Sequence, residues 1–320
     1  MRLTTTFPIP AAPVSMNHRS RVLTMGSCFA ASMGSRLSKL PLEVMTQPFG
    51  TLFHPFAISR ALSGEVSEEV YEQGGYFLHP DYHSIFTATS SADLLEDIRS
   101  VATEVATFAA SSDFIILTWG TSFSYFDKHL NKTVANCHKM PAYRFEKRLS
   151  TVEEIVSNFG SLISTLPSTK QVILTVSPVR HTKDGMTENQ VSKSTLRVAA
   201  DIVSKQFENV HYFPAYEIML DELRDYRFYE ADMIHPNDQA QDYIWERFME
   251  TYFDSELQEI SKRWNSIYRT LAHKPHPAKL IDHRRVLEVL LAELNGEKYQ
   301  EIDRCKIAEY VAHEIKNTYI

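Results

Sequence analysis

The chain has 320 residues and carries 33 Lys and Arg against 40 Asp and Glu, a formal net charge of −7. Hydrophobic residues at 43% and charged residues at 23% are ordinary for a globular protein, which excludes a chain that is disordered throughout. The acidic balance argues against a nucleic-acid binder, because neutralising phosphates requires a basic face. We expect one large domain, or one domain with an appendage.

The three cysteines, Cys28, Cys137 and Cys305, are widely spaced and form no C-x-x-C pair. This pattern predicts neither a zinc ribbon nor a disulfide framework, and it favours a reducing compartment. The first residues lack the apolar run of a secretory signal, and no stretch has the ~18 consecutive apolar residues of a membrane span. We therefore expect a cytoplasmic protein that contacts no membrane and carries no metal ion or cofactor.

From residue 21 onward, short apolar runs alternate with stretches whose apolar residues recur every three or four positions. The runs predict strands and the periodic stretches predict helices. The predicted strands are 22–25, 43–47, 114–117, 172–176 and 210–213, and the predicted helices among them are 29–37, 92–110, 152–166 and 187–207. Strands alternating with helices imply an α/β fold with a parallel sheet covered on both faces. The binding crevice of such a sheet lies beyond the carboxyl ends of its strands.

After Pro236 the sequence is helical. Residues 244–271 predict one long amphipathic helix or two abutting ones, and two further helices are predicted at 286–294 and 305–315. We expect one domain over 1–254 and a helical extension over 255–320. The apolar stripe of the extension could form a homodimer interface or simply cap the domain.

The end of the first predicted strand carries a candidate nucleophile. Gly26 permits a sharp turn into a helix, and the freed backbone N–H groups of that turn can stabilise an oxyanion. A thiol at the start of a helix benefits from the helix dipole, so we expect a lowered pKa for Cys28. Ser27 competes with Cys28 for the role of nucleophile. The alternative is that Cys28 is a small buried apolar residue.

A candidate base stands far downstream, at Asp232, His235 and Pro236. Pro236 suits the first position of a helix and biases His235 toward an extended backbone. Asp232, three residues before His235, is close enough to orient the imidazole. This is the arrangement of a general base held by a carboxylate.

Residues 26–30 spell Gly-Ser-Cys-Phe-Ala, the motif for which the GSCFA-domain family is named. The segments 136–139, 177–181 and 232–236 also resemble blocks of that family, so the similarity covers roughly residues 20–255. The family in turn resembles the SGNH (GDSL-like) hydrolases, which are esterases and lipases. The resemblance implies a three-layer α/β/α sandwich with a parallel, flavodoxin-like sheet.

The resemblance also implies roles for residues at the first and last blocks. Cys28 stands at the serine of the Gly-Asp-Ser-Leu block, and Ser27 stands at its aspartate. We favour Cys28 as the nucleophile, because this alignment and the helix-start argument agree. Asp232 and His235 match the last block fully.

The match implies an altered oxyanion hole. Gly50 matches the block-two glycine whose N–H binds the oxyanion, whereas Ser122 replaces the asparagine of the third block. Asn136 could supply the missing amide. Loss of one oxyanion donor typically lowers kcat by about 10²–10³, so this departure weighs against ordinary serine-esterase activity.

Further polar residues near predicted strand ends are candidates for substrate binding: His83, His138, Arg180 and His181. The segment 79–83, with two histidines four apart and an acid between them, could instead bind a metal. Pro80 makes a helix there unfavourable, so rather than a metal site we expect a loop that lines the crevice or merely satisfies its own backbone.

The leading hypothesis is a hydrolase of SGNH type that acts on small acyl esters, including O-acylated saccharides, through Cys28 or Ser27 with His235 and Asp232. A thiol nucleophile also admits an acyltransferase that takes its acyl group from a thioester donor. The rival hypothesis is a catalytically degenerate fold that serves as a binding or scaffold module.

Overall fold

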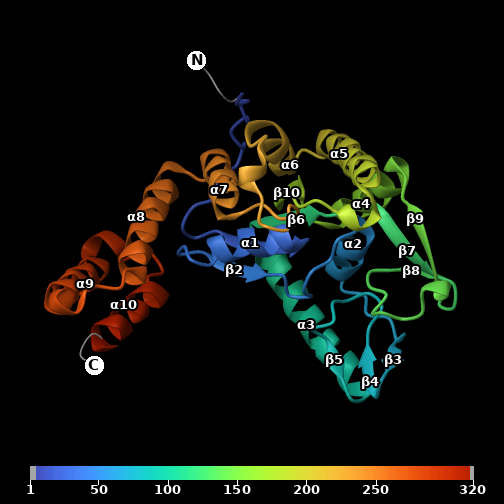
Figure 1. Cartoon of the computed structure of the whole chain (residues 1–320), viewed down its shortest axis with the longest axis horizontal. Coiled ribbons are helices and arrows are strands. Elements are labelled where there is room, and N and C mark those ends of the chain that lie inside the picture. The colour runs from blue at the N-terminus through green and yellow to red at the C-terminus, as the bar shows by residue number, and fades with distance from the viewer. Residues whose placement is uncertain (1–4, 318–320) are drawn as a thin grey trace.

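The structure is a computed structural model and describes residues 5–317. Its centre is a five-stranded sheet in the order β2-β1-β6-β10-β11, with every neighbouring pair parallel (Figure 1). The strands are β1 (Arg21–Gly26), β2 (Glu43–Thr46), β6 (Phe114–Trp119), β10 (Gln171–Val176) and β11 (Val210–Tyr212). The predicted parallel α/β sheet is therefore confirmed, strand by strand.

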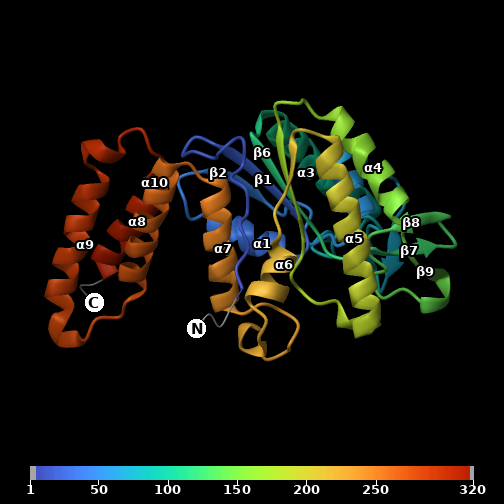
Figure 2. The same ribbon diagram turned by 90° about the horizontal axis from the view of Figure 1, so that it is seen from above.

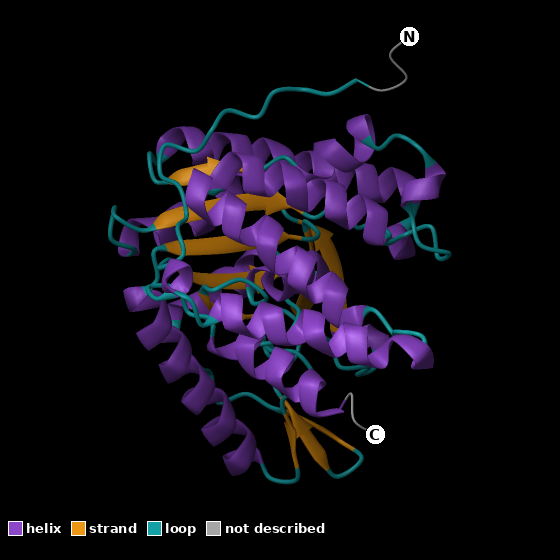
Figure 3. Cartoon of the chain, turned by 90° about the vertical axis from the view of Figure 1, so that its left-hand side faces the viewer, coloured by secondary structure: helices purple, strands orange, loops and turns teal. Residues whose placement is uncertain are grey.

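Helices cover both faces of this sheet (Figures 2 and 3). One face carries α1 (Cys28–Leu37), α6 (Ala215–Glu217) and α7 (Asp238–Tyr252), and the other carries α2 (Pro55–Ser63), α3 (Ser91–Ser111), α4 (Val152–Thr165) and α5 (Met186–Gln206). Within β6, Phe114 and Ile116 pack in the first core, whereas Ile115 and Leu117 pack in the second. This alternation follows from the two-residue period of a strand. The layers are compatible with a three-layer sandwich.

Two small antiparallel sheets, which were not predicted, are inserted in the connections. The first consists of β3 (Tyr71–Gln73), β4 (Tyr76–Leu78) and β5 (Thr87–Ala88), and the second of β7 (Phe123–Asp127), β8 (Lys132–Val134) and β9 (Phe145–Leu149). Their strands have two to five residues and many polar side chains. Such short runs give no usable hydrophobic period. The second sheet follows β6 directly and so lies beyond its carboxyl end.

The C-terminal helices lie to one side of the sheet (Figure 1). They are α8 (Ser255–Ala272), α9 (Leu280–Leu294) and α10 (Cys305–Asn317). Of the two predicted alternatives for 244–271, two helices are formed, because the Asp254 side chain caps α8 by accepting from the Leu257 N–H at 2.7 Å. The Trp264 and Tyr299 rings pack inside the three-helix unit with centroids 5.2 Å apart. The domain boundary at 254 remains a prediction.

The start of α7 corrects one expectation. Pro236 is not the first helical residue, since α7 begins at Asp238 with Asn237 as its cap. The Asn237 side chain accepts a hydrogen bond from the Ala240 N–H at 3.0 Å, which fixes the start two residues later.

Within residues 5–317, none of the helices combines the length and the apolar character that crossing a bilayer would require.

Candidate functional site

The corner after β1 depends on Gly26. Its φ of +134° is a conformation that residues with a Cβ rarely adopt, and a Cβ built there would lie 2.2 Å from the Thr118 carbonyl oxygen. The next residue, Ser27, donates its N–H to that same oxygen at 3.0 Å. The corner is therefore pressed against β6, which lies beside β1 in the sheet.

Gln47 holds the corner from the other side. Its Oε1 accepts the Gly26 N–H at 2.9 Å, and its Nε2 donates to the carbonyls of Gly26 and Ser27 at 2.9 and 2.8 Å. One amide side chain thus bonds to three backbone groups at the end of the strand. The two carbonyls also accept the N–H groups of Leu52 and Ala30, whereas the Gly26 N–H depends on Gln47. Sequence reasoning missed Gln47, because nothing in its local pattern distinguishes it from any polar residue at a strand end.

Cys28 is better placed than Ser27 to meet a substrate. The Ser27 side chain is 1% exposed, and its hydroxyl has no hydrogen-bond partner among the described residues. Cys28, the first residue of α1, is partly exposed, and its sulfur faces the N–H groups of Phe29 and of Cys28 itself. Cys28 is thus the more accessible of the two side chains, and its role as nucleophile remains a prediction.

The pKa of Cys28 moves in the opposite direction to the one expected. Burial raises it above the ordinary value, and this outweighs the lowering by the charge of Lys193 and by the backbone N–H groups. Desolvation disfavours the thiolate more than the helix start favours it. The thiol therefore needs a proton acceptor.

Lys193 is the charged side chain that acts on the pKa of Cys28. It lies on α5, is 1% exposed, and donates from Nζ to the carbonyls of Gly120 and Ser177 at 2.7 and 2.8 Å. Those carbonyls follow β6 and β10, so the amine lies over the carboxyl edge of the sheet. Burial lowers the pKa of Lys193 to about 7.

A signal for Lys193 was present in the sequence. The buried positions of α5 recur at helical spacing, and position 193 falls among them. A lysine on the inward face of a helix is rarely fully buried without a specific partner. The helix was predicted, but the lysine at one of its inward positions was not identified as a candidate site residue.

Asp232 and His235 form the predicted pair. His235 Nδ1 lies 2.7 Å from Asp232 Oδ2, and Asp232 Oδ1 accepts the N–H groups of Ile234 and His235 at 2.8 and 3.0 Å. These hydrogen bonds, that of the imidazole first, lower the pKa of Asp232 to about 2. A proton held on Nδ1 by the carboxylate leaves Nε2 free to accept one. Both side chains are about half exposed.

The loop that carries His235 is tied to the carboxyl edge of the sheet. Arg180, just after β10, donates its N–H to the Ile234 carbonyl at 3.1 Å. Gln241 donates from Nε2 to the Pro236 carbonyl at 2.9 Å, and its Oε1 contacts the Ser32 hydroxyl. Ser32 is one helical turn after Cys28 on α1. The loop is therefore linked both to β10 and to the helix that begins with Cys28.

Two of the three predicted oxyanion donors are engaged elsewhere. The Gly50 N–H donates to the Gln47 carbonyl at 2.8 Å. Ser122 is fully buried, and its hydroxyl bonds to Ser192 at 3.1 and 3.2 Å. Neither group is free to meet an oxyanion in this arrangement. The N–H groups of Cys28 and Phe29 at the start of α1 are better placed.

Three of the four predicted substrate-binding residues, together with Asn136, line one cavity of about 700 Å³. They are His83, His138 and His181. The fourth, Arg180, is not part of this lining. Its guanidinium packs on the Tyr229 ring, 3.9 Å from the centroid, and donates to the Met233 carbonyl at 3.2 Å. Arg180 therefore supports the loop that carries His235.

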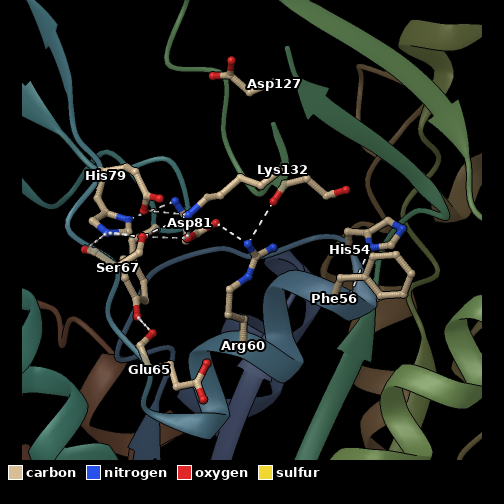
Figure 4. A network of polar contacts seen from close by, with 12 residues as sticks. His54, Phe56, Arg60, Glu65, Ser67, His79, Asp81, Asp127 and Lys132 are labelled. Carbon is tan, nitrogen blue, oxygen red and sulfur yellow. Dashed lines mark hydrogen bonds and ion pairs between the residues drawn. The ribbon is translucent and has the colours of Figure 1, made fainter. Parts of the chain in front are cut away.

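The segment 79–83 belongs to a network of polar contacts (Figure 4). The buried Asp81 carboxylate pairs with Arg60 and Lys132, each at 2.9 Å, and the Lys132 ammonium also bonds to Ser67. His79 contacts the Ser67 carbonyl from Nε2 at 3.0 Å. With two cations already on its carboxylate, Asp81 is a poor metal ligand. Across the described part of the chain, no three His, Cys, Asp or Glu side chains gather as metal ligands.

Comparison with curated proteins found no match to this sequence. The sequence profile of the GSCFA family matches residues 21–248, which is most of the chain. The matched range begins with β1, contains the corner at Cys28 and the pair Asp232–His235, and ends within α7. The chain is thus a member of the GSCFA family.

Proposed function

We propose that this protein processes acyl groups through a thiol nucleophile, in the manner of an SGNH-type hydrolase. The observation that carries the proposal is one arrangement at the carboxyl edge of the sheet. Cys28 starts α1 at a glycine corner, and the hydrogen-bonded pair Asp232–His235 lies in a loop linked to that same helix. A nucleophile, a base and a carboxylate that orients the base are the parts that acyl transfer needs.

The proposed reaction has two steps. His235 Nε2 takes the thiol proton, and Cys28 Sγ attacks the acyl carbonyl carbon. The C–O bond of an ester, or the C–S bond of a thioester, then breaks, and His235 gives its proton to the leaving group. The acyl group stays on Cys28 as the acyl-enzyme. Water or an acceptor hydroxyl then attacks the acyl carbon while His235 accepts its proton. The S–C bond breaks, and His235 gives that proton to the departing Cys28 sulfur. The N–H groups of Cys28 and Phe29 stabilise the oxyanion in both steps.

Lys193 supports the thiolate in this scheme. Its charge lowers the pKa of Cys28, against the raising effect of burial. Small acyl esters, including O-acylated saccharides, are the expected substrates, and a thioester donor with a hydroxyl acceptor is the transferase version of the same chemistry.

A second function is favoured by a different observation. The Gly50 N–H and the Ser122 hydroxyl, both candidates for an oxyanion hole, are engaged in hydrogen bonds within the fold. A protein that has lost these donors could act as a binding or scaffold module. The oriented Asp232–His235 pair weighs against this alternative, because a binding module needs no oriented base.

Trapping of an acyl-enzyme tests the proposal. The protein is incubated with a small activated acyl ester, and intact mass and peptide mapping locate any added acyl group. We expect acylation of Cys28, its loss in Cys28→Ala, and a slow rate in His235→Ala. Cys305→Ala, which removes an exposed thiol in α10, is the matched control and should label as the wild type. Equal labelling and turnover in Cys28→Ala and the wild type would contradict the mechanism.

A further inference from the structure

The cavity of about 700 Å³ carries an excess of positive charge in a chain whose net charge is −7. Lys139, Lys147 and Lys183 line it, and among its described lining residues Asp184 is the one carboxylate. Asp184 is paired with Lys147, so two ammonium groups remain without a carboxylate in the lining. A concave site with one sign of charge concentrates ligands of the opposite sign.

Neutral donors add to this charge. Asn136 Oδ1 accepts the His138 N–H at 2.9 Å, which leaves the Asn136 amide N–H groups as donors. His83 Nδ1 accepts the Ile85 N–H at 3.2 Å, so the remaining ring proton of neutral His83 is on Nε2. Amide and imidazole N–H groups beside lysines form a donor set suited to an oxyanion.

The rest of the wall is apolar and partly aromatic. Phe53, Tyr125 and Phe145 line the cavity, as do Ala135 and Met140. Side chains of this kind bury the body of a ligand while a few polar groups fix its orientation. The lining therefore suits a molecule with a flat apolar body and a negatively charged group.

The turn that presents Lys139 is held in an unfavourable backbone conformation. His138 and Lys139 have φ values of +46° and +58°, and the Met140 N–H closes the turn on the Cys137 carbonyl at 2.9 Å. Two consecutive left-handed residues that are not glycine cost about 1–2 kcal/mol each. The buried His138 ring anchors the turn by bonding to the His79 carbonyl at 2.8 Å. The surrounding fold thus fixes the backbone position of Lys139 at the cavity wall.

The cavity adjoins the corner that carries Cys28. Thr51 and Phe53 line it, and between them Leu52 donates its N–H to the Gly26 carbonyl at 2.9 Å. The Phe53 ring packs against His181, another lining residue, with centroids 5.6 Å apart. Burial and then the charge of Lys193 lower the pKa of His181, and the same charge opposes the raising effect of burial on the pKa of Cys28, so both residues lie near this buried amine.

We propose that this cavity binds the anionic group, a carboxylate or a phosphate, of a small molecule with a flat apolar body, through Lys139, Lys183 and Asn136. Applied to the substrate, the proposal rests on the proposed function, because it names the class of acyl compound that Cys28 attacks. The leaving group of that compound is an aryl or similar body that carries a negative charge. As a statement about binding, the proposal stands without the reaction.

Binding is measured first, on Cys28→Ala protein, so that no reaction interferes. Titration calorimetry with phenyl phosphate and with benzoate separates the two anions, and benzyl alcohol is the neutral probe of similar size. We expect either anion to bind more tightly than the alcohol. Lys139→Met and Lys183→Met should each weaken anion binding roughly three- to tenfold, as loss of a charge-assisted hydrogen bond does. Lys205→Met, on the exposed side of α5, should have no effect.

Turnover is measured second, on the wild type, with the acetate esters of 4-hydroxybenzoate, phenol and 4-hydroxyphenyl-trimethylammonium. We expect kcat/KM to fall in that order, and the preference for the anion to shrink in the double variant K139M/K183M. Anion binding that is lost in the lysine variants supports the cavity even when no ester is cleaved, which would sink only the proposed function. Ester cleavage with no charge preference overturns the assignment of the substrate class, and anion binding unchanged in the double variant overturns the cavity proposal itself.

Discussion

A buried lysine that titrates near neutral pH must leave a signature in the stability of the protein. Burial lowers the pKa of Lys193 from 10.5 to about 7. Above pH 7 the folded protein therefore binds fewer protons at this site than the unfolded chain does. Stability rises with pH wherever the unfolded state binds more protons, so the contribution of Lys193 becomes more favourable between pH 7 and 10.5.

The size of the effect follows from the pKa difference. One pKa unit corresponds to ~1.4 kcal/mol, and integrating the single-site linkage from pH 7 to 8.5 gives roughly 1–2 kcal/mol. The window ends at pH 8.5 because Cys28, whose ordinary value is 9.0, and the tyrosines titrate above it. The perturbation is Lys193→Met, which keeps the length of the side chain and removes the amine.

The assay is urea unfolding of the wild type and Lys193→Met at pH 7.0, 7.5, 8.0 and 8.5. The variant leaves the Gly120 and Ser177 carbonyls without their donor, which lowers stability by the same amount at every pH. The informative quantity is therefore the difference in slope, with the wild type gaining stability relative to the variant as pH rises. Lys205→Met, which removes an exposed lysine of α5, is the control and should follow the wild type. Parallel slopes for the wild type and Lys193→Met would show that the buried amine keeps its proton and would refute the reasoning.

Three further predictions concern the corner and the base. Gly26→Ala should lower the free energy of unfolding by roughly 3 kcal/mol or more, because its Cβ would meet the neighbouring strand. Gly64→Ala, at φ +76° in open space, should lower it by about 1–2 kcal/mol. Urea titrations compare the two variants, and equal losses would contradict the close-approach argument. Gln47→Ala leaves the Gly26 N–H without its partner and removes one of two donors from the Gly26 and Ser27 carbonyls, so we expect a loss of about 1–3 kcal/mol in the same titration together with a changed alkylation rate of Cys28. A loss of stability with unaltered alkylation would mean that Gln47 does not position the thiol. Asp232→Asn should reduce acyl-ester turnover by about 10²–10⁴ without unfolding the protein, because the imidazole of His235 loses the carboxylate that orients it. Wild-type kcat in the variant would exclude His235 as an oriented base.

The central fold could be predicted because its signals are strong and local. Apolar runs such as 114–117 are buried on both faces of a parallel sheet, and that burial is what makes them continuous in the sequence. The corner at Gly26 and the pair Asp232–His235 were predicted for a similar reason, since each depends on residues within a few positions of one another.

Features that depend on contacts between distant residues were not predictable in the same way. Gln47 acts on a corner twenty residues earlier in the chain, and the partners of Lys193 follow two different strands. The sign of the shift at Cys28 depends on how deeply the corner is buried, which a local helix-start argument does not contain. Ser122 was assigned by position in a motif, and only the approach of Ser192 from α5 shows that its hydroxyl is already engaged.

The antiparallel sheet of β7, β8 and β9 and the turn at 138–139 form much of the cavity wall. The corner after β1, which Gln47 holds by hydrogen bonds, carries the sulfur of Cys28. Under the proposed function, the reacting sulfur and the ligand-binding wall would therefore belong to separate stretches of chain joined through the loop at 50–53. Insertions or replacements in the hairpins can retune which compounds are admitted, and the attacking atom need not shift. The proposed reaction and the proposed ligand class could therefore vary independently of one another on this scaffold.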